Sequence, residues 1–270
     1  MPSRPIAIFD SGVGGLSVLR EVHGLLPGED LLYLADQAHV PYGPRAPDEV
    51  RRLCEGAARF FLAQGAKLVV VACNTACAAA LHHLRETFPA VPFVGMEPAV
   101  KPAARASRSG VIGVLATPGT LNGKPFCSVV ERFAQGVRVL TRTCPGLVEA
   151  VEAGETGGPR LRALVGEAVA PLLAEGIDAL VMGCTHYPLA GDAIREACGP
   201  GVELVDPSPA VARQVRRRLE ELGLLRAAPG PGQTAFATTG DPERLRALLR
   251  ALWGSGGEVR GVRWRGREIG

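Results

Sequence analysis

Two short motifs place a cysteine between an apolar run and hydroxyl-bearing residues. They are Ala72-Cys73-Asn74-Thr75 and Gly183-Cys184-Thr185-His186. A thiol that leaves a buried strand and enters the start of a helix is in an environment that lowers its pKa. Two such thiols on opposite sides of one carbon atom can invert its configuration, because one removes a proton and the other delivers one. The motifs therefore predict inversion by paired acid–base groups. His186 either caps a helix, tunes the Cys184 thiol or relays its proton.

The cysteine motifs end the two copies of an internal repeat. Residues 62–73 align without gaps on residues 173–184, and Leu, Ala, Gly, Val and Cys coincide at a constant spacing. A weaker match pairs residues 6–13 with residues 112–119. Two similar halves that face one another would place the two thiols on opposite sides of one cleft.

A glycine-rich loop, Asp10-Ser11-Gly12-Val13-Gly14-Gly15, follows the first apolar run. It is not a dinucleotide-binding loop, because Ser17 stands where the third glycine belongs, and it is not a P-loop, because no lysine follows. A carboxylate and a hydroxyl beside free N–H groups at a helix start suit an anionic substrate. The alternative is a tight glycine turn capped by Asp10. A second loop, after Asp36, carries Pro41-Tyr42-Gly43 and is either a rigid wall of a site or a structured turn.

Other roles for the cysteines fit the sequence less well. Zinc binding would use Cys77 and His186 together with the paired thiols, but Cys-x3-Cys and Cys-x-His are poor zinc spacings. A redox pair is disfavoured because Cys-x-x-Cys is absent from the chain. We therefore expect no metal. The remaining cysteines are interpreted as core or surface residues, namely Cys54, Cys77, Cys127, Cys144 and Cys198.

Pyridoxal chemistry is also disfavoured. A pyridoxal enzyme needs a lysine that forms a Schiff base with the cofactor. The chain contains three lysines, Lys67, Lys101 and Lys124, and none of them lies beside a cysteine motif. We therefore expect the proton transfer to proceed without any cofactor.

Short apolar runs alternate with longer segments of helical periodicity. Such alternation predicts an α/β fold with mainly parallel sheets flanked by helices. Ligands of such sheets bind where the strands end at their carboxyl edge, which is where the cysteine motifs lie. Asp241-Pro242 before a periodic apolar segment predicts a helix start. The predicted strands are 6–9, 31–34, 68–71, 91–94, 111–115, 137–140, 179–182, 202–205 and 234–237. The predicted helices include 13–26, 48–62, 159–174 and 210–222.

We interpret the chain as two pseudo-symmetric domains with the active site in the cleft between them. The proline-containing stretches 97–102 and 206–209 are the natural crossovers. The first domain then comprises residues 1–97 plus 208–270, and the second comprises residues 98–207. The tail of the chain returns to the first half in this interpretation.

Composition excludes several classes of protein. The chain has 270 residues, of which 47% are hydrophobic and 21% are charged, unlike a disordered or fibrous chain. The net charge of +3 gives no nucleic-acid footprint. The apolar runs are too short to cross a membrane, and Asp10 interrupts the first of them, so no signal peptide is predicted. Seven irregularly spaced cysteines then indicate reduced thiols and a cytoplasmic location.

At these motifs the chain resembles the glutamate racemases of the cofactor-independent aspartate/glutamate racemase superfamily. The resemblance runs from residue 6 to about residue 252. The matching stretches are 8–16, 41–43, 72–76, 117–120, 183–189 and 239–242. The resemblance implies interconversion of L- and D-glutamate, which supplies the D-isomer for peptidoglycan.

The resemblance also implies the roles of individual residues. Cys184 would deprotonate L-glutamate, assisted by His186. Cys73 would deprotonate D-glutamate, assisted by Asp10. Glu152 matches a family glutamate near the site. The residues implied to bind substrate are Asp10, Ser11, Tyr42, Gly43, Asn74, Thr75, Thr117, Thr120, Glu152, Thr185 and His186.

The sequence departs from the family pattern at a few positions. Cys77 stands where a serine is common, and Leu147 and Glu149 replace bulkier or proline positions, which affects loops rather than chemistry. The nearest alternative is an aspartate or hydantoin racemase, which shares the thiols but not this combination of loops. Another is a non-catalytic module that binds DNA gyrase, as some relatives do, but no basic extension supports it. The expected partner is the substrate glutamate, with no nucleic acid and no membrane. A homodimer is compatible with the family.

Overall fold

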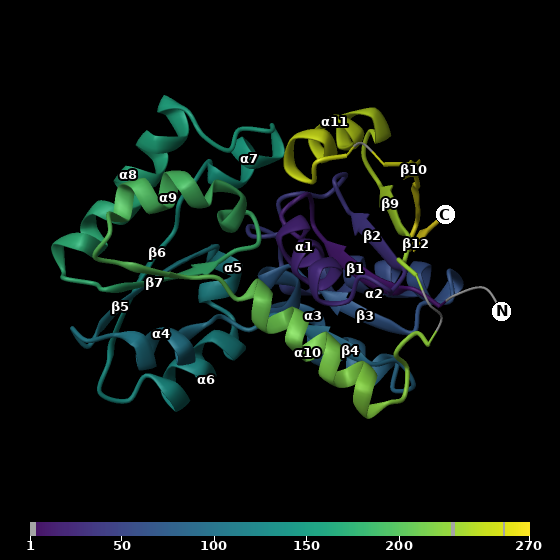
Figure 1. Ribbon diagram of the computed structural model, residues 1–270, viewed down its shortest axis with the longest axis horizontal. Coiled ribbons are helices and arrows are strands. Elements are labelled where there is room, and N and C mark those ends of the chain that lie inside the picture. Colours follow the sequence, from purple (N-terminus) through teal and green to yellow (C-terminus); the bar gives the residue numbers. More distant parts are fainter. Residues whose placement is uncertain (1–3, 228–229, 256) are drawn as a thin grey trace.

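The computed structural model describes residues 4–227, 230–255 and 257–270 and forms two lobes, each built on its own sheet (Figure 1). The first sheet has six strands in the order β10-β9-β2-β1-β3-β4, and the second has four in the order β6-β5-β7-β8. Neighbouring strands are parallel throughout both sheets. The strands of the first sheet are β1 (Ile6–Asp10), β2 (Leu31–Ala35), β3 (Leu68–Val71), β4 (Phe93–Gly95), β9 (Thr234–Thr238) and β10 (Val259–Gly261). Those of the second are β5 (Val111–Ala116), β6 (Arg138–Arg142), β7 (Ala179–Gly183) and β8 (Glu203–Val205).

Helices flank both sheets, which confirms the predicted α/β fold class. The helices are α1 (Leu16–Leu25), α2 (Pro47–Ala63), α3 (Asn74–Thr87), α4 (Val100–Ala106), α5 (Pro118–Leu121), α6 (Lys124–Phe133), α7 (Leu147–Glu152), α8 (Pro159–Ala174), α9 (Gly191–Cys198), α10 (Ser208–Glu221) and α11 (Pro242–Leu252). In Figure 1, α8 and α9 lie above the second sheet and α4 and α6 lie below it. In the first lobe, α1 packs along α10 and α2 packs along α3.

The predicted strands agree closely with the structure. Each of the nine predicted strands overlaps an observed strand, and the ends differ by two residues or fewer. Helix α8 begins and ends where the sequence predicts. Asp241 caps α11, because its side chain accepts the N–H of Glu243 at 2.9 Å.

The predicted start of the first helix was wrong. Helix α1 begins at Leu16 and not at Val13, because residues 12–15 form a turn in front of it. The N–H of Val13 donates to the carboxylate of Glu152, which belongs to the other lobe. The glycine-rich segment is therefore held by a distant side chain rather than by the first turn of the helix.

The two sheets repeat one another in strand order and in register. The order β2-β1-β3-β4 corresponds to β6-β5-β7-β8. Ile6 pairs with Leu68 in the first sheet, and Ile112 pairs with Ala179 in the second. These residues occupy equivalent places in the sequence repeat, so the repeat has a structural basis.

The tail of the chain adds strands to the first sheet. Strand β9 pairs with β2, and β10 pairs with β9. The last residues form a short antiparallel hairpin of β11 (Trp264–Arg265) and β12 (Glu268–Ile269), and β12 packs against α2. The sequence did not predict β10, β11 or β12, because these strands are only two or three residues long and each contains a charged residue.

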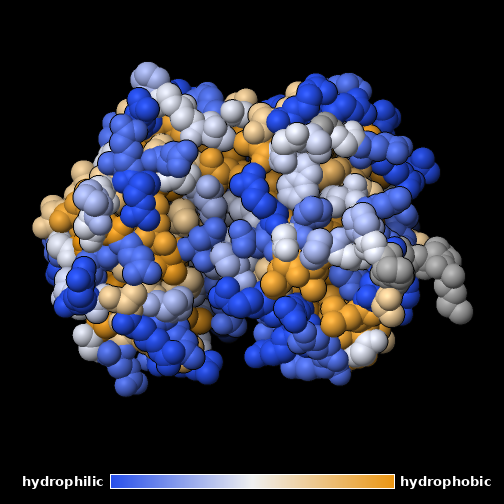
Figure 2. Space-filling model, viewed as in Figure 1, coloured by the Kyte–Doolittle hydropathy of each residue, from blue (hydrophilic) through white to orange (hydrophobic). Residues whose placement is uncertain are grey.

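One apolar cluster fills the first lobe and continues into the α7–α9 side of the second sheet, and Leu115 belongs to it. Ile112 and Val114 point to the opposite face of β5 and belong to a separate cluster under α4 and α6. Figure 2 shows hydrophilic residues over much of the visible surface and an indentation between the lobes. Within the described ranges, no helix is long and apolar enough to span a membrane.

Candidate active site

The candidate site lies where the carboxyl ends of the two sheets face one another. Strands β1 and β3 end there in the first lobe, and β5 and β7 end there in the second. Most of the residues that line a cavity of about 20 Å³ follow these four strands, and the others come from the loop after β2 and from α7. The lining residues are Ser11, Pro41, Tyr42, Gly43, Cys73, Asn74, Thr75, Thr117, Val148, Cys184, Thr185 and His186. Both thiols of the repeat therefore reach the same cavity, one from each lobe.

Most residues that the sequence nominates for the site belong to this lining. Asp10, Thr120 and Glu152 lie behind it, and each forms a hydrogen bond to a lining residue. The sequence did not single out Val148, because an apolar residue in a short helix looks like any core residue. Pro41 lies within a matching motif, but it was not nominated as a binding residue.

The first thiol belongs to Cys73, which is buried and is the N-cap residue of α3. Burial raises its pKa, and the negative charge of Asp10 raises it further. The N–H of Ala76 and the hydroxyl of Ser11 act in the opposite direction, but they do not prevail. The expectation that the helix start lowers the pKa of this thiol was therefore wrong, because desolvation outweighs the helix. Cys73 holds its proton in the resting protein.

Alkylation by iodoacetamide should reveal this state of Cys73. Because the thiolate is the reacting form, the reaction should be slow near neutral pH and should still accelerate between about pH 8 and pH 10. Mass spectrometry of the digested protein measures the rate at each cysteine, and the exposed Cys127 serves as the control for the reagent. A rate at Cys73 that reaches its plateau below about pH 8 would contradict the raised pKa.

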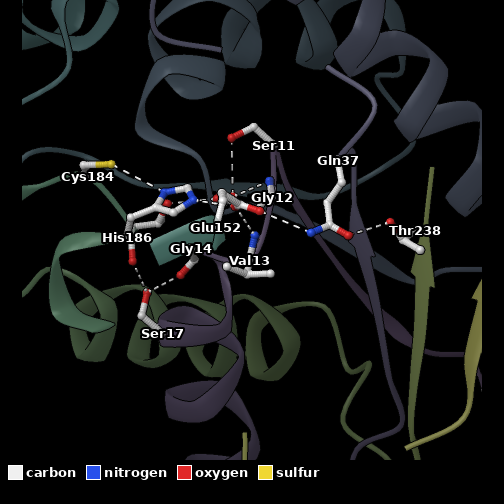
Figure 3. A network of polar contacts seen from close by, with 12 residues as sticks. Ser11, Gly12, Val13, Gly14, Ser17, Gln37, Glu152, Cys184, His186 and Thr238 are labelled. Carbon is white, nitrogen blue, oxygen red and sulfur yellow. Dashed lines mark hydrogen bonds and ion pairs between the residues drawn. The ribbon is translucent and has the colours of Figure 1, made fainter. Parts of the chain in front are cut away.

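The second thiol, that of Cys184, ends a row of three side chains in the second lobe (Figure 3). Its Sγ lies 3.7 Å from Nδ1 of His186, and Nε2 of His186 lies 2.7 Å from Oε1 of Glu152. Glu152 also accepts the N–H of Val13 at 2.6 Å and the side-chain amide of Gln37 at 3.2 Å. The imidazole is thus held on both sides, with one nitrogen directed at the thiol.

The histidine and the glutamate of this row form a buried ion pair. Burial alone would lower the pKa of His186, but its hydrogen bonds to Cys184 and Glu152 raise that pKa well above the usual value. Burial alone would raise the pKa of Glu152, but the hydrogen bond and charge of His186 lower it. His186 is therefore protonated, and its Nδ1 faces the sulfur of Cys184.

Two N–H groups of the glycine-rich turn are already bonded to carboxylates of the protein. The N–H of Gly12 donates to Oδ1 of Asp10 at 2.9 Å, and the N–H of Val13 donates to Glu152. Oδ2 of Asp10 accepts the hydroxyl of Thr185 from the other lobe at 3.0 Å. Burial raises the pKa of the Asp10 carboxyl above its usual value. Asp10 therefore caps the turn, and the N–H groups of Gly12 and Val13 are not available to a substrate anion.

Two glycines of the turn leave room for side chains of the second lobe. A Cβ at Gly12 would lie 1.8 Å from Oε1 of Glu152. A Cβ at Gly14 would lie 2.4 Å from Nδ1 of His186 and 2.5 Å from Oγ1 of Thr185. Glycine is required here because the backbone of one lobe touches Glu152, Thr185 and His186 of the other.

Hydroxyl groups and one amide complete the cavity wall. Oγ1 of Thr75 lies 2.8 Å from Oγ1 of Thr117, which links the two lobes, and Thr117 lies 3.1 Å from Thr120. The side-chain nitrogen of Asn74 lies 2.9 Å from the sulfur of Met96. Oδ1 of Asn74 is buried and has no hydrogen-bond partner among the described residues. An unsatisfied acceptor that faces a cavity suits a donor on a ligand.

Metal binding finds no support in the part of the chain that the structure describes, since it has no group of three or more His, Cys, Asp or Glu side chains placed to hold a metal ion.

Comparison with known proteins agrees with this geometry. The curated glutamate racemase of Roseiflexus sp. is 54% identical over 251 residues, which cover 93% of this chain and 92% of that protein. The glutamate racemase of Stutzerimonas stutzeri is 51% identical, and the match covers 94% of this chain and 96% of that protein. The Escherichia coli glutamate racemase in complex with L-glutamate and the activator UDP-MurNAc-ala superposes with a TM-score of 0.84 at 32% identity, covering 96% of this chain and 97% of that one. The Thermus thermophilus glutamate racemase in complex with beta-chloro-D-alanine gives 0.83 at 40% identity, covering 97% and 98%. The model of the Asp/Glu/Hydantoin racemase family matches residues 15–215, and the chain belongs to that family.

Proposed function

We propose that this protein interconverts L- and D-glutamate without a cofactor, with Cys73 and Cys184 as the two acid–base groups. The observation that carries the mechanism is that two thiols from equivalent positions of a repeat line one cavity. The relatives support glutamate as the substrate, because they are glutamate racemases and the match covers nearly their whole length. The D-isomer would supply peptidoglycan synthesis, and we place the enzyme in the cytoplasm.

The two thiols exchange one proton each with the substrate. From L-glutamate, the thiolate of Cys184 accepts the α-proton, and the thiol of Cys73 donates its proton to the opposite face of the carbanion. Cys184 then carries a proton and Cys73 is a thiolate, so D-glutamate meets the same groups with their roles exchanged. His186 lies 3.7 Å from the sulfur of Cys184 and would assist proton transfer on that side. The raised pKa of Cys73 keeps that thiol ready to donate.

The other polar groups of the wall would hold the substrate. The unsatisfied Oδ1 of Asn74 would accept a hydrogen bond from the substrate ammonium group, close to the carboxyl of Asp10. The N-terminus of α3, which begins at Asn74, favours a carboxylate through its free N–H groups and its dipole. The hydroxyls of Thr75 and Thr117 would donate to the carboxylate oxygens, and that of Thr185 would join them once it leaves Asp10.

We also propose that the two lobes are the two domains that the sequence predicts. We propose the boundaries 1–97 plus 208–270 and 98–207. Two features support them: strands β9 and β10 join the first sheet, and the second sheet consists of strands from residues 111–205.

Racemisation in D₂O tests the assignment of two separate bases. Starting from L-glutamate, the D-glutamate formed early should carry deuterium at Cα, while the remaining L-glutamate should stay unlabelled. The reason is that each thiol holds one proton, and the donor thiol was loaded from solvent before substrate bound. Mass spectrometry of the separated enantiomers at low conversion gives the result, and D-glutamate as starting material should give the reverse pattern. Unlabelled product would point to a single base instead.

A racemisation assay with a panel of amino acids separates glutamate racemisation from the alternatives. Circular dichroism follows the loss of ellipticity as each enantiomer racemises, without added metal or pyridoxal phosphate. Glutamate should be racemised fastest. Faster turnover of aspartate or of a hydantoin would reassign the substrate while leaving the two-thiol mechanism in place.

A further inference from the structure

The C-terminal hairpin reaches toward the candidate site through one side chain, that of Trp264. Its indole is half-buried and lies over Gly56 of α2, where a Cβ would be only 2.4 Å from two carbon atoms of the ring. The imidazole of His39 lies against it edge-on, with ring centroids 5.4 Å apart. The indole N–H donates to Oδ1 of Asp36 at 2.7 Å. These contacts fix the position of the indole ring and direct its N–H at Asp36.

Asp36 collects donors from three parts of the first lobe. It follows β2 and is fully buried. Besides the indole of Trp264, it accepts the hydroxyl of Thr239 at 2.6 Å and the hydroxyl of Tyr42 at 2.6 Å. Hydrogen bonds to a carboxylate are short and strong, so they fix the orientation of their donors. The hydroxyl of Tyr42 is therefore directed at Asp36, and both Tyr42 and Gly43 line the cavity.

The loop that Tyr42 belongs to presses closely against the second lobe. A Cβ at Gly43 would lie 3.2 Å from Cβ of Thr117, and a Cβ at Gly119 would lie 3.0 Å from the carbonyl oxygen of Gly43. Thr117 also carries the hydrogen bond to Thr75 that closes the cavity. A small displacement of this loop therefore changes the shape of the wall that meets the substrate.

We propose that Trp264 is a positioning residue for substrate binding, acting through Asp36 on Tyr42 and the loop 41–43. The inference rests on the proposed function for its kinetic readout. The proposal gives the hairpin of β11 and β12 a role in the active site, whereas the sequence motifs assign no role to this segment. The indole does not line the cavity, so its effect is on the affinity for glutamate and not on proton transfer.

Replacement of Trp264 by Phe keeps an aromatic ring over Gly56 and removes the donor to Asp36. KM for glutamate should rise by about 3–10-fold in both directions, while kcat should change by less than about twofold. Trp253 offers a matched control, since it is the second of the two tryptophans and is also half-buried in the first lobe. It packs on His23 and Phe236, away from Asp36, so Trp253→Phe should leave both constants unchanged.

A double-mutant cycle distinguishes positioning from general stabilisation of the lobe. In a Tyr42→Phe background the path through the hydroxyl is already broken, so Trp264→Phe should add little to KM. An equal rise of KM in both backgrounds would overturn the proposal. So would a Trp264→Phe variant with a lower melting temperature and an unchanged KM, because the indole would then only stabilise the fold.

Fluorescence provides a test that does not require the Trp264 variant to fold. In the Trp253→Phe protein, Trp264 is the sole tryptophan, and glutamate binding should change its emission with saturation, although the indole does not line the cavity. The change should disappear when Tyr42→Phe is added. Emission that stays constant while glutamate binds, as followed by calorimetry, would overturn the proposal. Failure of the unmodified protein to racemise glutamate would instead contradict the proposed function.

Discussion

Replacement of either Cys73 or Cys184 by alanine is expected to abolish racemisation almost completely in both directions. Removal of one general acid–base group typically costs about 10²–10⁴-fold in rate. The loss here should lie at or beyond the upper end of that range, because inversion needs a proton acceptor on one face and a proton donor on the other. The loss should appear in kcat, since neither thiol supplies the hydrogen bonds that hold glutamate.

The control for this experiment is a cysteine that lies in the lobe of Cys184 but does not line the cavity. Cys198 ends α9 and is buried, so Cys198→Ala removes a similar thiol from the second lobe. Its turnover should stay close to normal, and circular dichroism should give the same fold for all three variants. Turnover above about a tenth of normal in Cys73→Ala or Cys184→Ala would remove that cysteine from the mechanism.

Replacement of Gly14 by alanine is expected to lower kcat by about 10²-fold although no functional group is removed. The added methyl group would lie 2.4 Å from Nδ1 of His186 and 2.5 Å from Oγ1 of Thr185. Such distances are far below van der Waals contact, so the imidazole must turn away from Cys184. A displacement of about 1 Å in a catalytic group can cost 10²-fold in rate.

Gly24 supplies the comparison for the alanine substitution. It lies in α1, and a Cβ there would meet nothing within 4 Å. Gly24→Ala should therefore retain normal kcat and stabilise the protein by about 1 kcal/mol through helix propensity. Steady-state kinetics in both directions and thermal unfolding measure the two quantities. A Gly14→Ala enzyme with kcat within about threefold of normal would show that the position of His186 is not critical.

The sequence predicts this fold well because its signals are local. The apolar runs of the strands and the Asp241-Pro242 cap depend on neighbours in the chain, and they agree with the structure. The paired thiols could be nominated for a similar reason. Each follows a strand directly, and the repeat places them at equivalent positions, which the common register of β1–β3 and β5–β7 explains.

The features that the sequence could not predict depend on contacts between distant segments. The N–H of Val13 looks free in the sequence, and only the fold brings Glu152 to it from 139 positions away. The burial that raises the pKa of Cys73 is likewise a property of the closed cleft and not of the motif. The bond between Trp264 and Asp36 joins residues 228 positions apart. Short strands such as β10 form only because a sheet edge already exists for them.

The narrowness of the cavity has a consequence for how the enzyme can be inhibited. A space of about 20 Å³ holds roughly one water molecule, and glutamate has about ten non-hydrogen atoms. We therefore expect the cavity to widen when glutamate enters, at the expense of bonds that cross between the lobes, such as those of Thr75 with Thr117 and of Asp10 with Thr185. Opening is then a gate on both uptake and release. A compound wedged between the parted lobes would stop the reaction without contacting either thiol, and glutamate would displace it only by drawing the lobes back to the closed state.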